Sequence, residues 1–412
     1  MRATVHAGIL GVHHVRRHLV AVALGIAVLA AAMSPLPAVV DAVTGAPAGN
    51  ADLVNPALYL VLAPLSNLLD ALTFLSLDRA KALLVTWILV LALVGALRSG
   101  TARRRLVRAL AGVAFVLALA VAAVLLPRPV PRLVTGESDV AVVDLHSHTI
   151  ASHDGRFGWT PAKLAQWHAV QGFQAAYVTD HNRPFAGSTS AAIPLLPGAE
   201  WSVHRQHIVA LGATTPLDLA SYSSNTPGML TLFAALHAQG ALAIASLPEY
   251  WKNHRDELDQ FVAAGVDGFE IVNCSPKGLA FSAAARRTVI DLAQRHNRLV
   301  TGASDNHGWG KVTCVWNLSR QGTQGFADNH VVARPIALLQ GDGVPTWAGV
   351  SQPWLMLRAL SWPERMSWLT WITLVAAYRG LPRRNGQRRG LGFLARSLGR
   401  RPGKKAADAH EA

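Results

Sequence analysis

The first third of the chain consists of long apolar runs separated by short polar and basic segments. Three runs are near the length of roughly 20 residues that an α-helix needs to span a bilayer, namely 18–40, 82–97 and 106–126. A fourth run, 57–77, contains Asn67 and Asp70, so it either spans, re-enters or lies at the interface. Residues 1–135 are therefore predicted to form a transmembrane region of three or four helices, unless the first run is a signal peptide.

The pattern changes over residues 139–301 to short apolar runs that alternate with helical segments. The run 140–143 ends in Asp-Leu-His-Ser-His, and a helix is then expected from the N-cap residue Thr160 to Gly172. The next run, 173–178, ends in Thr-Asp-His-Asn. About seven strand–helix units of this kind predict an α/β fold with parallel strands. The polar motifs follow the strand ends, which is the edge that carries the chemistry in such folds.

Beyond the alternating region, residues 331–412 are interpreted as a C-terminal extension. Residues 316–360 show no clear period, so they either complete the central domain or cap its mouth. The apolar segment 366–378 is short for a span, and we expect a crossing only if it is extended to 354–378. Residues 379–405 carry ten Lys/Arg, so the alternative is an amphipathic segment that lies on anionic lipid.

Composition supports the membrane interpretation. Of the 412 residues, 51% are hydrophobic and only 15% are charged, and the mean hydropathy is positive. Residues 140–330 contain 13 Lys/Arg and 14 Asp/Glu, whereas the rest of the chain holds 25 and 10, so the net charge of +14 belongs to the flanks. These basic clusters adjoin apolar runs, which favours membrane lipid as a partner and not nucleic acid.

The placement of arginine also predicts an orientation. The loop 98–108 holds five arginines and is therefore expected in the cytoplasm. The run 106–126 then carries the chain outward, so the central domain of a multi-pass membrane protein lies outside the cytoplasm. This side does not depend on whether 57–77 crosses.

Histidine is concentrated in the central domain, where 12 of the 17 lie between residues 140 and 330. His146 and His148 are two apart in an extended segment, so both imidazoles can face one metal ion, with Asp154 and His181 available to complete the site. Of the two cysteines, Cys274 and Cys314, neither has zinc-finger spacing. We expect two buried free thiols, with a disulfide as the alternative if the domain lies outside the cytoplasm.

The order of motifs in the central domain resembles the polymerase-and-histidinol-phosphatase (PHP) superfamily of metal-dependent hydrolases, and most closely its carbaryl-hydrolase-like branch. The resemblance covers residues 139–311, under half of the chain, and rests on the segments DLHSHT, SHDG, TPAKL, YVTDHN, PGAEW, HIVALG, VDGFEIVN and GASDNH. It implies that residues 139–330 form a distorted (β/α)7 barrel, with metals at the C-terminal face of the strands.

Matching the family's motifs position by position implies a set of metal ligands: His146, His148, Asp154, His181, Glu200, His207, Asp305 and His307. The mixture of imidazole and carboxylate suits two or three divalent ions of Zn, Mn or Fe, which would activate water for hydrolysis. Among these residues Asp154, Glu200 and His307 are the candidates for a catalytic role, with Glu200 able to bridge two ions. His153 stands where many relatives have an aspartate, and it remains a reserve ligand beside Asp154.

One position departs from the family. Relatives have a histidine ligand where this chain has Leu247, so Glu249, His254 or Asn273 would have to reach in, or fewer ions are bound. Together with the apolar runs, the resemblance predicts a membrane-anchored metal-dependent hydrolase; the predicted substrate is a small-molecule phosphate ester, which the resemblance itself does not fix. The alternatives are hydrolysis of a carboxyl or carbamate ester, and a degenerate metal-binding sensor without turnover.

Overall fold

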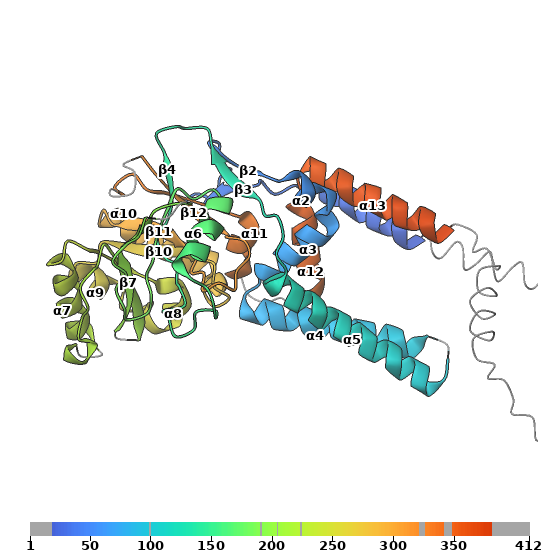
Figure 1. The fold of residues 1–412 in the computed structure, drawn as a ribbon, viewed down its shortest axis with the longest axis horizontal. Coiled ribbons are helices and arrows are strands. Elements are labelled where there is room, and N and C mark those ends of the chain that lie inside the picture. The colour runs from blue at the N-terminus through green and yellow to red at the C-terminus, as the bar shows by residue number, and fades with distance from the viewer. Residues whose placement is uncertain are drawn as a thin grey trace, which may run out of the picture. The chain divides into compact units, whose positions relative to one another are not determined.

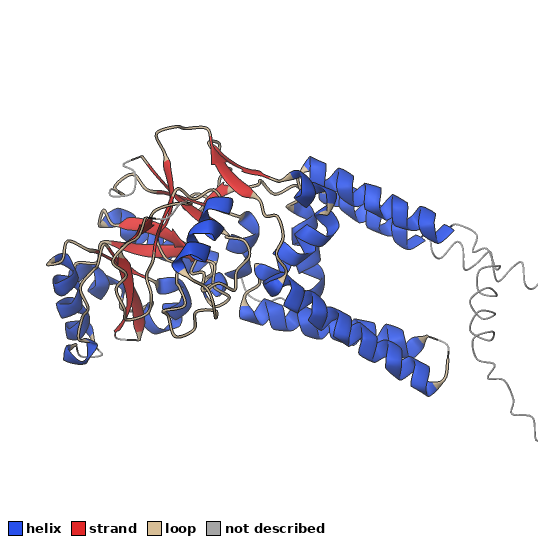
Figure 2. Cartoon of the chain, in the orientation of Figure 1, coloured by secondary structure: helices blue, strands red, loops and turns tan. Residues whose placement is uncertain are grey.

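The computed structural model describes residues 19–98, 100–189, 192–203, 205–222, 225–320, 326–341 and 348–380 (Figures 1 and 2). Residues 26–369 group into one compact unit, and residues 1–25 with 370–412 form a second. All the strands, the candidate site and helices α2 to α5 belong to the first unit.

A six-stranded sheet forms one half of the central domain. In spatial order it contains β1 (Val40–Asp41), β13 (His330–Ala333), β12 (Val315–Ser319), β4 (Ala141–Asp144), β5 (Ala175–Tyr177) and β6 (Leu195–Leu196). β4, β5 and β6 run parallel, as expected for strands joined through a helix. β12 pairs antiparallel with both β4 and β13, and β1 pairs antiparallel with β13.

A five-stranded sheet forms the other half, in the order β11 (Leu299–Ala303), β10 (Gly268–Asn273), β9 (Leu242–Ala245), β8 (Gln206–Leu211) and β7 (Gly198–Val203). The prediction that every unit is parallel is wrong here, because β8 runs antiparallel to both β7 and β9. Val203 pairs with Gln206 across a tight turn, and a connection this short can only join antiparallel strands.

The two sheets meet at their edges. Among the described residues, no strand ladder joins them into a closed barrel. Single parallel bridges link Ser147 to Asn306 and His181 to Glu200, just beyond the ends of β4 and β5. The side chain of Asn317 on β12 donates hydrogen bonds to the carbonyl oxygens of Val143 on β4 and Gly302 on β11. The α/β class is therefore confirmed, and the strand ends of both sheets come together at one edge.

Helices cover the outer faces of the sheets. They are α6 (Pro161–Val170), α7 (Thr226–His237), α8 (Leu247–His254), α9 (Leu258–Ala263), α10 (Ala283–Arg295) and α11 (Pro335–Leu338). The predicted cap of α6 is confirmed, because the Thr160 side chain accepts a hydrogen bond from the backbone N–H of Lys163. Gly172 follows with φ +96°, and a Cβ there would lie 2.4 Å from the carbonyl oxygen of Leu133, so only glycine fits.

Among the described residues, two helices are long and apolar enough to cross a membrane, α4 (Leu77–Leu97) and α5 (Ala102–Leu125). Their tight antiparallel packing uses glycine: a Cβ on Gly95 would lie 2.8 Å from the backbone nitrogen of Ala109, and one on Gly112 would lie 2.8 Å from Cβ of Leu91. Only 11% of each apolar window is buried by protein. Both helices therefore present most of their apolar surface outward.

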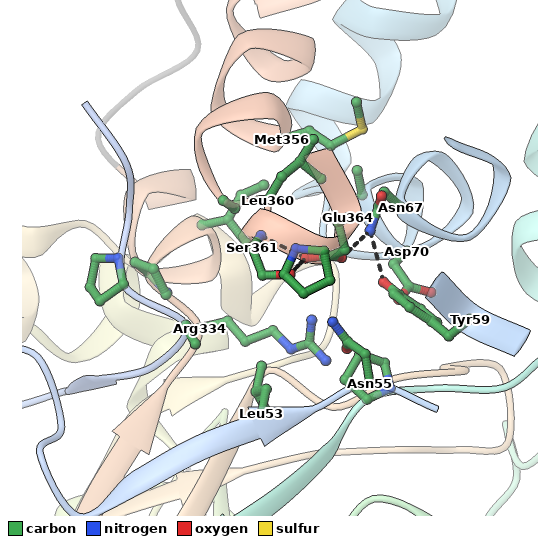
Figure 3. A pocket seen from close by; sticks show the side chains of 18 of the residues that line it. Leu53, Asn55, Tyr59, Asn67, Asp70, Arg334, Met356, Leu360, Ser361 and Glu364 are labelled. Atoms are coloured by element: carbon green, nitrogen blue, oxygen red, sulfur yellow. Dashed lines mark hydrogen bonds between the residues drawn. The ribbon is translucent and has the colours of Figure 1, made fainter. Parts of the chain in front are cut away.

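The run 57–77 does not form a single span. It contains the short helices α2 (Ala57–Val61) and α3 (Ala63–Thr73), neither long enough to cross a bilayer. Its polar residues are buried and paired. Asp70 forms an ion pair with Arg128 at 2.9 Å, and Asn67 donates hydrogen bonds to Tyr59 and Glu364 beside a cavity of about 350 Å³ (Figure 3). These residues thus fasten α3 to neighbouring helices.

The outermost apolar runs also differ from the predicted spans. The first helix is described over Leu19–Ala31, and residue 18, where its run begins, lies outside the described residues. The end of that run is not helical, because Val40 belongs to β1. Segment 354–378 is divided between α12 (Ala348–Arg358) and α13 (Trp362–Gly380), and neither is among the helices apolar enough to span. The basic tail beyond residue 380 lies outside the described residues.

The two cysteines form a disulfide, so the expectation of free thiols is wrong. Cys274 follows β10 and Cys314 precedes β12, which ties the two sheets together across a sequence separation of 40 residues. We expect the double substitution of both cysteines by serine to lower the free energy of unfolding by about 2–4 kcal/mol, because a loop of this length is no longer closed in the unfolded chain. Thermal unfolding of the full chain in detergent, with and without reductant, measures this. Full thiol reactivity of the unreduced native protein would contradict the disulfide.

Candidate metal centre

The eight side chains predicted as ligands converge where the strand ends of the two sheets meet. Six of them line one pocket of about 540 Å³, namely Asp154, His181, Glu200, His207, Asp305 and His307. His146 and His148 are fully buried beneath it and contact the same carboxylates. All eight thus belong to a single cluster, although they come from sequence positions as far apart as 146 and 307.

The inner part of the cluster consists of two imidazoles facing two carboxylates. His148 Nε2 lies 3.2 Å from both Glu200 Oε2 and Asp305 Oδ1. His146 Nε2 lies 3.3 Å from Glu200 Oε2 and 3.5 Å from Asp305 Oδ1. The two Nε2 atoms are 2.9 Å apart. Four potential ligand atoms therefore point at one small volume.

The outer part of the cluster lines the pocket. His181 contacts Glu200 through Nδ1 at 2.9 Å and Asp154 through Nε2 at 3.5 Å. His307 Nε2 lies 3.2 Å from Asp154 Oδ1, and His207 Nδ1 lies against the second oxygen of Glu200. Glu200 consequently stands between the inner and outer groups, as expected of a bridging carboxylate.

Buried partners fix the orientation of the imidazoles. His148 Nδ1 lies 2.9 Å from Ser152 Oγ, which donates its own proton to Asp180, so Nδ1 is the protonated nitrogen and Nε2 keeps its lone pair. His146 Nδ1 lies 2.6 Å from Glu270 Oε1 in the same way. Such contacts set the tautomer in which a histidine can bind a metal.

Glu270 was not among the predicted site residues. It lies on β10, which is buried along its whole length, and a carboxylate in such a strand is itself the signal that could have drawn attention to it. Its second oxygen accepts hydrogen bonds from Ser246 and Asn273. Asp144 is another buried carboxylate outside the cluster, where it contacts His168 and Ser304.

The arrangement of donor atoms fits divalent cations. With Nδ1 protonated on both His146 and His148, two lone pairs face each other at 2.9 Å, which is repulsive unless a cation or proton lies between them. His181 Nδ1 and Glu200 Oε2 are buried and lie 2.9 Å apart, but neither atom has a partner with hydrogen-bond geometry among the described residues. Four overlapping groups of His, Asp and Glu have ligand atoms within 4.8 Å of one another. This donor set suits Zn, Mn or Fe.

The electrostatics favour ionised carboxylates. Burial opposes the charge on Glu200, but His146 and His207 outweigh it and hold the pKa of Glu200 well below its usual range. Burial likewise opposes protonation of His307, yet its contacts with Asp154 and Asp305 raise the pKa of His307 to about 9. The ionised carboxylates are therefore stabilised by positive charge. A metal ion can supply that charge in place of the protons on the histidines.

The position of Leu247 is resolved by the fold. Leu247 begins α8 and is fully buried in the apolar core, away from the pocket. Glu249, two residues later, lines the pocket, and its carboxylate accepts a hydrogen bond from the Ser275 hydroxyl. Asn273 donates to Asp305 Oδ2 at 3.1 Å, whereas His254 is occupied by Glu257 and the carbonyl of Arg205. Glu249 and Asn273 thus reach the cluster and His254 does not.

This arrangement makes Glu249 the candidate for the missing ligand. We expect Glu249→Gln to lower the metal content of the purified full chain, because a neutral amide binds cations more weakly than a carboxylate. Leu247→His should fail to raise metal content and should cost about 2 kcal/mol or more of stability, since it buries an imidazole in an apolar core. Elemental analysis and thermal unfolding measure both effects. A gain of metal in Leu247→His would show that this strand end is misplaced.

His153 and Asp154 are both candidate ligands, and they differ in their contacts. Asp154 Oδ1 approaches both His181 and His307, whereas the ring of His153 lies beside that of His181, with centroids 4.9 Å apart. Both residues line the pocket. Asp154 therefore has the better-placed ligand atom, and His153 stays within reach.

No protein-family model and no curated protein sequence matches the chain. Two solved structures are similar to part of it. PsfC from Pseudomonas syringae PB-5123 has 22% sequence identity and a TM-score of 0.32, over 43% of this chain and 81% of that chain. The lesion-specific endonuclease PfuEndoQ from Pyrococcus furiosus has 14% identity and a TM-score of 0.32, over 43% of this chain and 52% of that chain. TM-scores this low support no argument, so the function is inferred from the site.

Proposed function

We propose that the protein is a membrane-anchored, metal-dependent hydrolase of phosphate esters with a PHP-like barrel. The observation that carries the proposal is the convergence of five imidazoles and three carboxylates on one pocket at the strand ends. Side chains of this kind are expensive to bury without a counter-ion, so their concentration favours a metal site over a structural role.

The cluster offers enough donors for two or three divalent ions. His146, His148 and Asp305 would hold the inner position, His181, His307 and Asp154 the outer one, and Glu200 would bridge them. When bound, such ions acidify a water molecule and polarise a phosphoryl oxygen.

The protein's own residues account for the proton transfers. In the proposed reaction, water adds to phosphorus, the ester P–O bond breaks, and the products are an alcohol and phosphate. Asp154, with a side chain 48% exposed, and His307 lie at the open side of the cluster. The Asp154 oxygen that does not hold the outer ion is placed to take the proton from water and to return it to the departing alkoxide, while His307 holds the ion. Glu200 is too deeply buried for this role, and it serves to hold the two halves of the site together.

The proposed anchor is the helix hairpin of α4 and α5. Most of the apolar surface of these two helices is not covered by other parts of the protein. A domain outside the cytoplasm agrees with the disulfide, because such bonds persist in oxidising compartments.

Topology is tested by reporter fusions. We expect alkaline phosphatase fused after Thr135 to be active, since residues 98–108 hold five arginines and should remain in the cytoplasm. A fusion within 98–108 is the matched control and should be inactive. Activity of a cytoplasmic reporter fused after Thr135 would show that the orientation is the opposite of the one proposed.

The hydrolase itself is tested with the purified full chain in detergent. After growth in metal-supplemented medium, elemental analysis should find at least about two ions per chain, in line with the size of the donor set. The loaded protein should hydrolyse phosphomonoesters or phosphodiesters in preference to carboxyl and carbamate esters. Less than one ion per chain contradicts the site, and metal binding without hydrolysis of any ester in the panel favours a sensor.

A further inference from the structure

The pocket of the candidate metal centre has a second wall that belongs to the proposed membrane anchor. Besides the cluster, the pocket is lined by Thr73 at the end of α3, Leu77 at the start of α4 and Val124 near the end of α5. The backbone N–H of Leu77 donates to the carbonyl oxygen of Pro276 at 3.0 Å, and Pro276 lines the same pocket. The helix hairpin therefore forms part of the wall of the pocket that contains the metal cluster.

The ends of the hairpin that reach the pocket are the ends away from the arginine-rich loop. The loop joins Leu97 of α4 to Ala102 of α5, whereas Leu77 and Val124 lie at the opposite ends (Figure 1). If the hairpin spans a bilayer with its arginines inside, Leu77 and Val124 lie at the outer membrane surface. The mouth of the pocket then opens where lipid head groups meet acyl chains.

The rest of the rim has the mixture of groups typical of that interface. Trp309 lines the pocket and is 49% exposed, and Lys277 also lines it. Phe157 does not line the pocket, but it follows the lining residue Asp154 by three positions and is 92% exposed. Exposed aromatic side chains beside lysine are characteristic of protein surfaces that contact a bilayer.

Positive charge adjoins this rim. Burial lowers the pKa of Lys311, the nearby charge of Arg156 adds to this effect, and Lys277 lines the pocket itself. Arg156 also donates to the carbonyl oxygen of Gly308, next to the pocket residues His307 and Trp309. Such a group of cations attracts anionic head groups.

We propose that the substrate is an amphiphile, a phosphate ester of a long apolar alcohol that resides in the outer leaflet. This inference rests on the proposed hydrolase function and specifies its substrate class. The phosphate reaches the metal cluster, and the first part of the apolar chain lies along Leu77 and Val124. A water-soluble ester has no apolar chain to contact Leu77 and Val124. The apolar side chains at the rim would then be exposed to water, which is unfavourable.

The test compares two esters that differ only in chain length, dodecyl phosphate and butyl phosphate, with the metal-loaded full chain in phosphatidylcholine nanodiscs. We expect kcat/KM to be at least about tenfold higher for the dodecyl ester, since burial of each methylene favours binding by a factor of roughly four. The ratio for the two esters should fall several-fold in Leu77→Ala and in Val124→Ala. Leu97→Ala and Val107→Ala are the matched controls, being equally apolar positions at the arginine-rich end, and should keep the ratio.

The outcomes separate this inference from the function on which it rests. Equal kcat/KM for both esters overturns the amphiphilic substrate and leaves the hydrolase standing. If the dodecyl-to-butyl ratio of kcat/KM also falls in Leu97→Ala and Val107→Ala, the effect is not specific to the pocket wall, and its proposed role is overturned. If no ester is hydrolysed, the proposed function fails, and binding of the non-hydrolysable dodecyl and butyl phosphonates decides the inference. Affinity that rises with chain length supports it, and equal affinity overturns it.

Discussion

Replacing His148 or Asp305 by alanine is expected to reduce hydrolysis by roughly 10²- to 10³-fold, the range observed when an active site loses one group that stabilises charge. His148 Nε2 lies 3.2 Å from Asp305 Oδ1, and both contact the inner face of the cluster. Each substitution removes a donor atom from the same proposed ion. Metal content should therefore fall together with activity, and by about the same extent in the two variants.

The fold should survive both substitutions. Besides the cluster, His148 contacts Ser152 and Asp305 contacts Asn273, so each truncation removes polar contacts and leaves the residues of the apolar core unchanged. His237→Ala is the matched control, because this histidine also contacts an aspartate, Asp267 at 2.8 Å, but lies outside the site. It should keep full metal content and activity. Wild-type turnover in both site variants, with intact thermal unfolding, would place the active site elsewhere.

Local signals in the sequence were sufficient for much of the central domain. Thr160 and Gly172 bracket α6 as expected, since capping and positive φ depend on a few neighbouring residues only. The His-x-His motif lies at the end of β4 for a comparable reason: residues two apart in an extended segment share a face. In these places short-range chemistry and the fold agree.

Strands buried on both faces escaped the prediction. All five residues of β12 are buried, so it shows no alternation of polar and apolar positions, and it contains the polar Asn317. Asn317 is tolerated there because it bonds the backbones of β4 and β11, which are distant in sequence. The direction of β8 was missed for a different reason, because a run of apolar residues carries no information on whether its neighbour is parallel.

The polar residues of the N-terminal region show the same limit. Asp70 looks like an obstacle to a membrane span when only the sequence around it is considered. Its partners Arg128 and Tyr59 explain it, because together they satisfy a buried carboxylate. Similarly, the family position of Leu247 suggested a missing ligand, but only the start of α8 at this residue shows that its side chain enters the core.

Glu270 provides the sharpest test of how the site is supported. It does not face the pocket, and its role depends on a contact with His146, 124 residues away in sequence. The carboxylate accepts the Nδ1–H of His146 through one oxygen and the hydroxyl proton of Ser246 through the other. The NH₂ group of a glutamine would face either the Nδ1–H of His146, which releases the tautomer, or Ser246 and Asn273, where it meets a second NH₂ group and leaves only a neutral acceptor behind His146.

We therefore expect Glu270→Gln to weaken metal binding by about 10- to 100-fold, the usual effect of losing a partner behind a metal-binding histidine. Competition with a chelator measures the affinity, and activity at saturating metal should recover most of its wild-type value, which distinguishes a positioning residue from a catalytic one. Glu257→Gln is the matched control, because Glu257 contacts His254 Nδ1 at 3.0 Å outside the pocket and should leave metal affinity unchanged. If Glu270→Gln also keeps wild-type affinity while folding normally, His146 does not bind the ion, and the inner position must be built from His148, Glu200 and Asp305 alone.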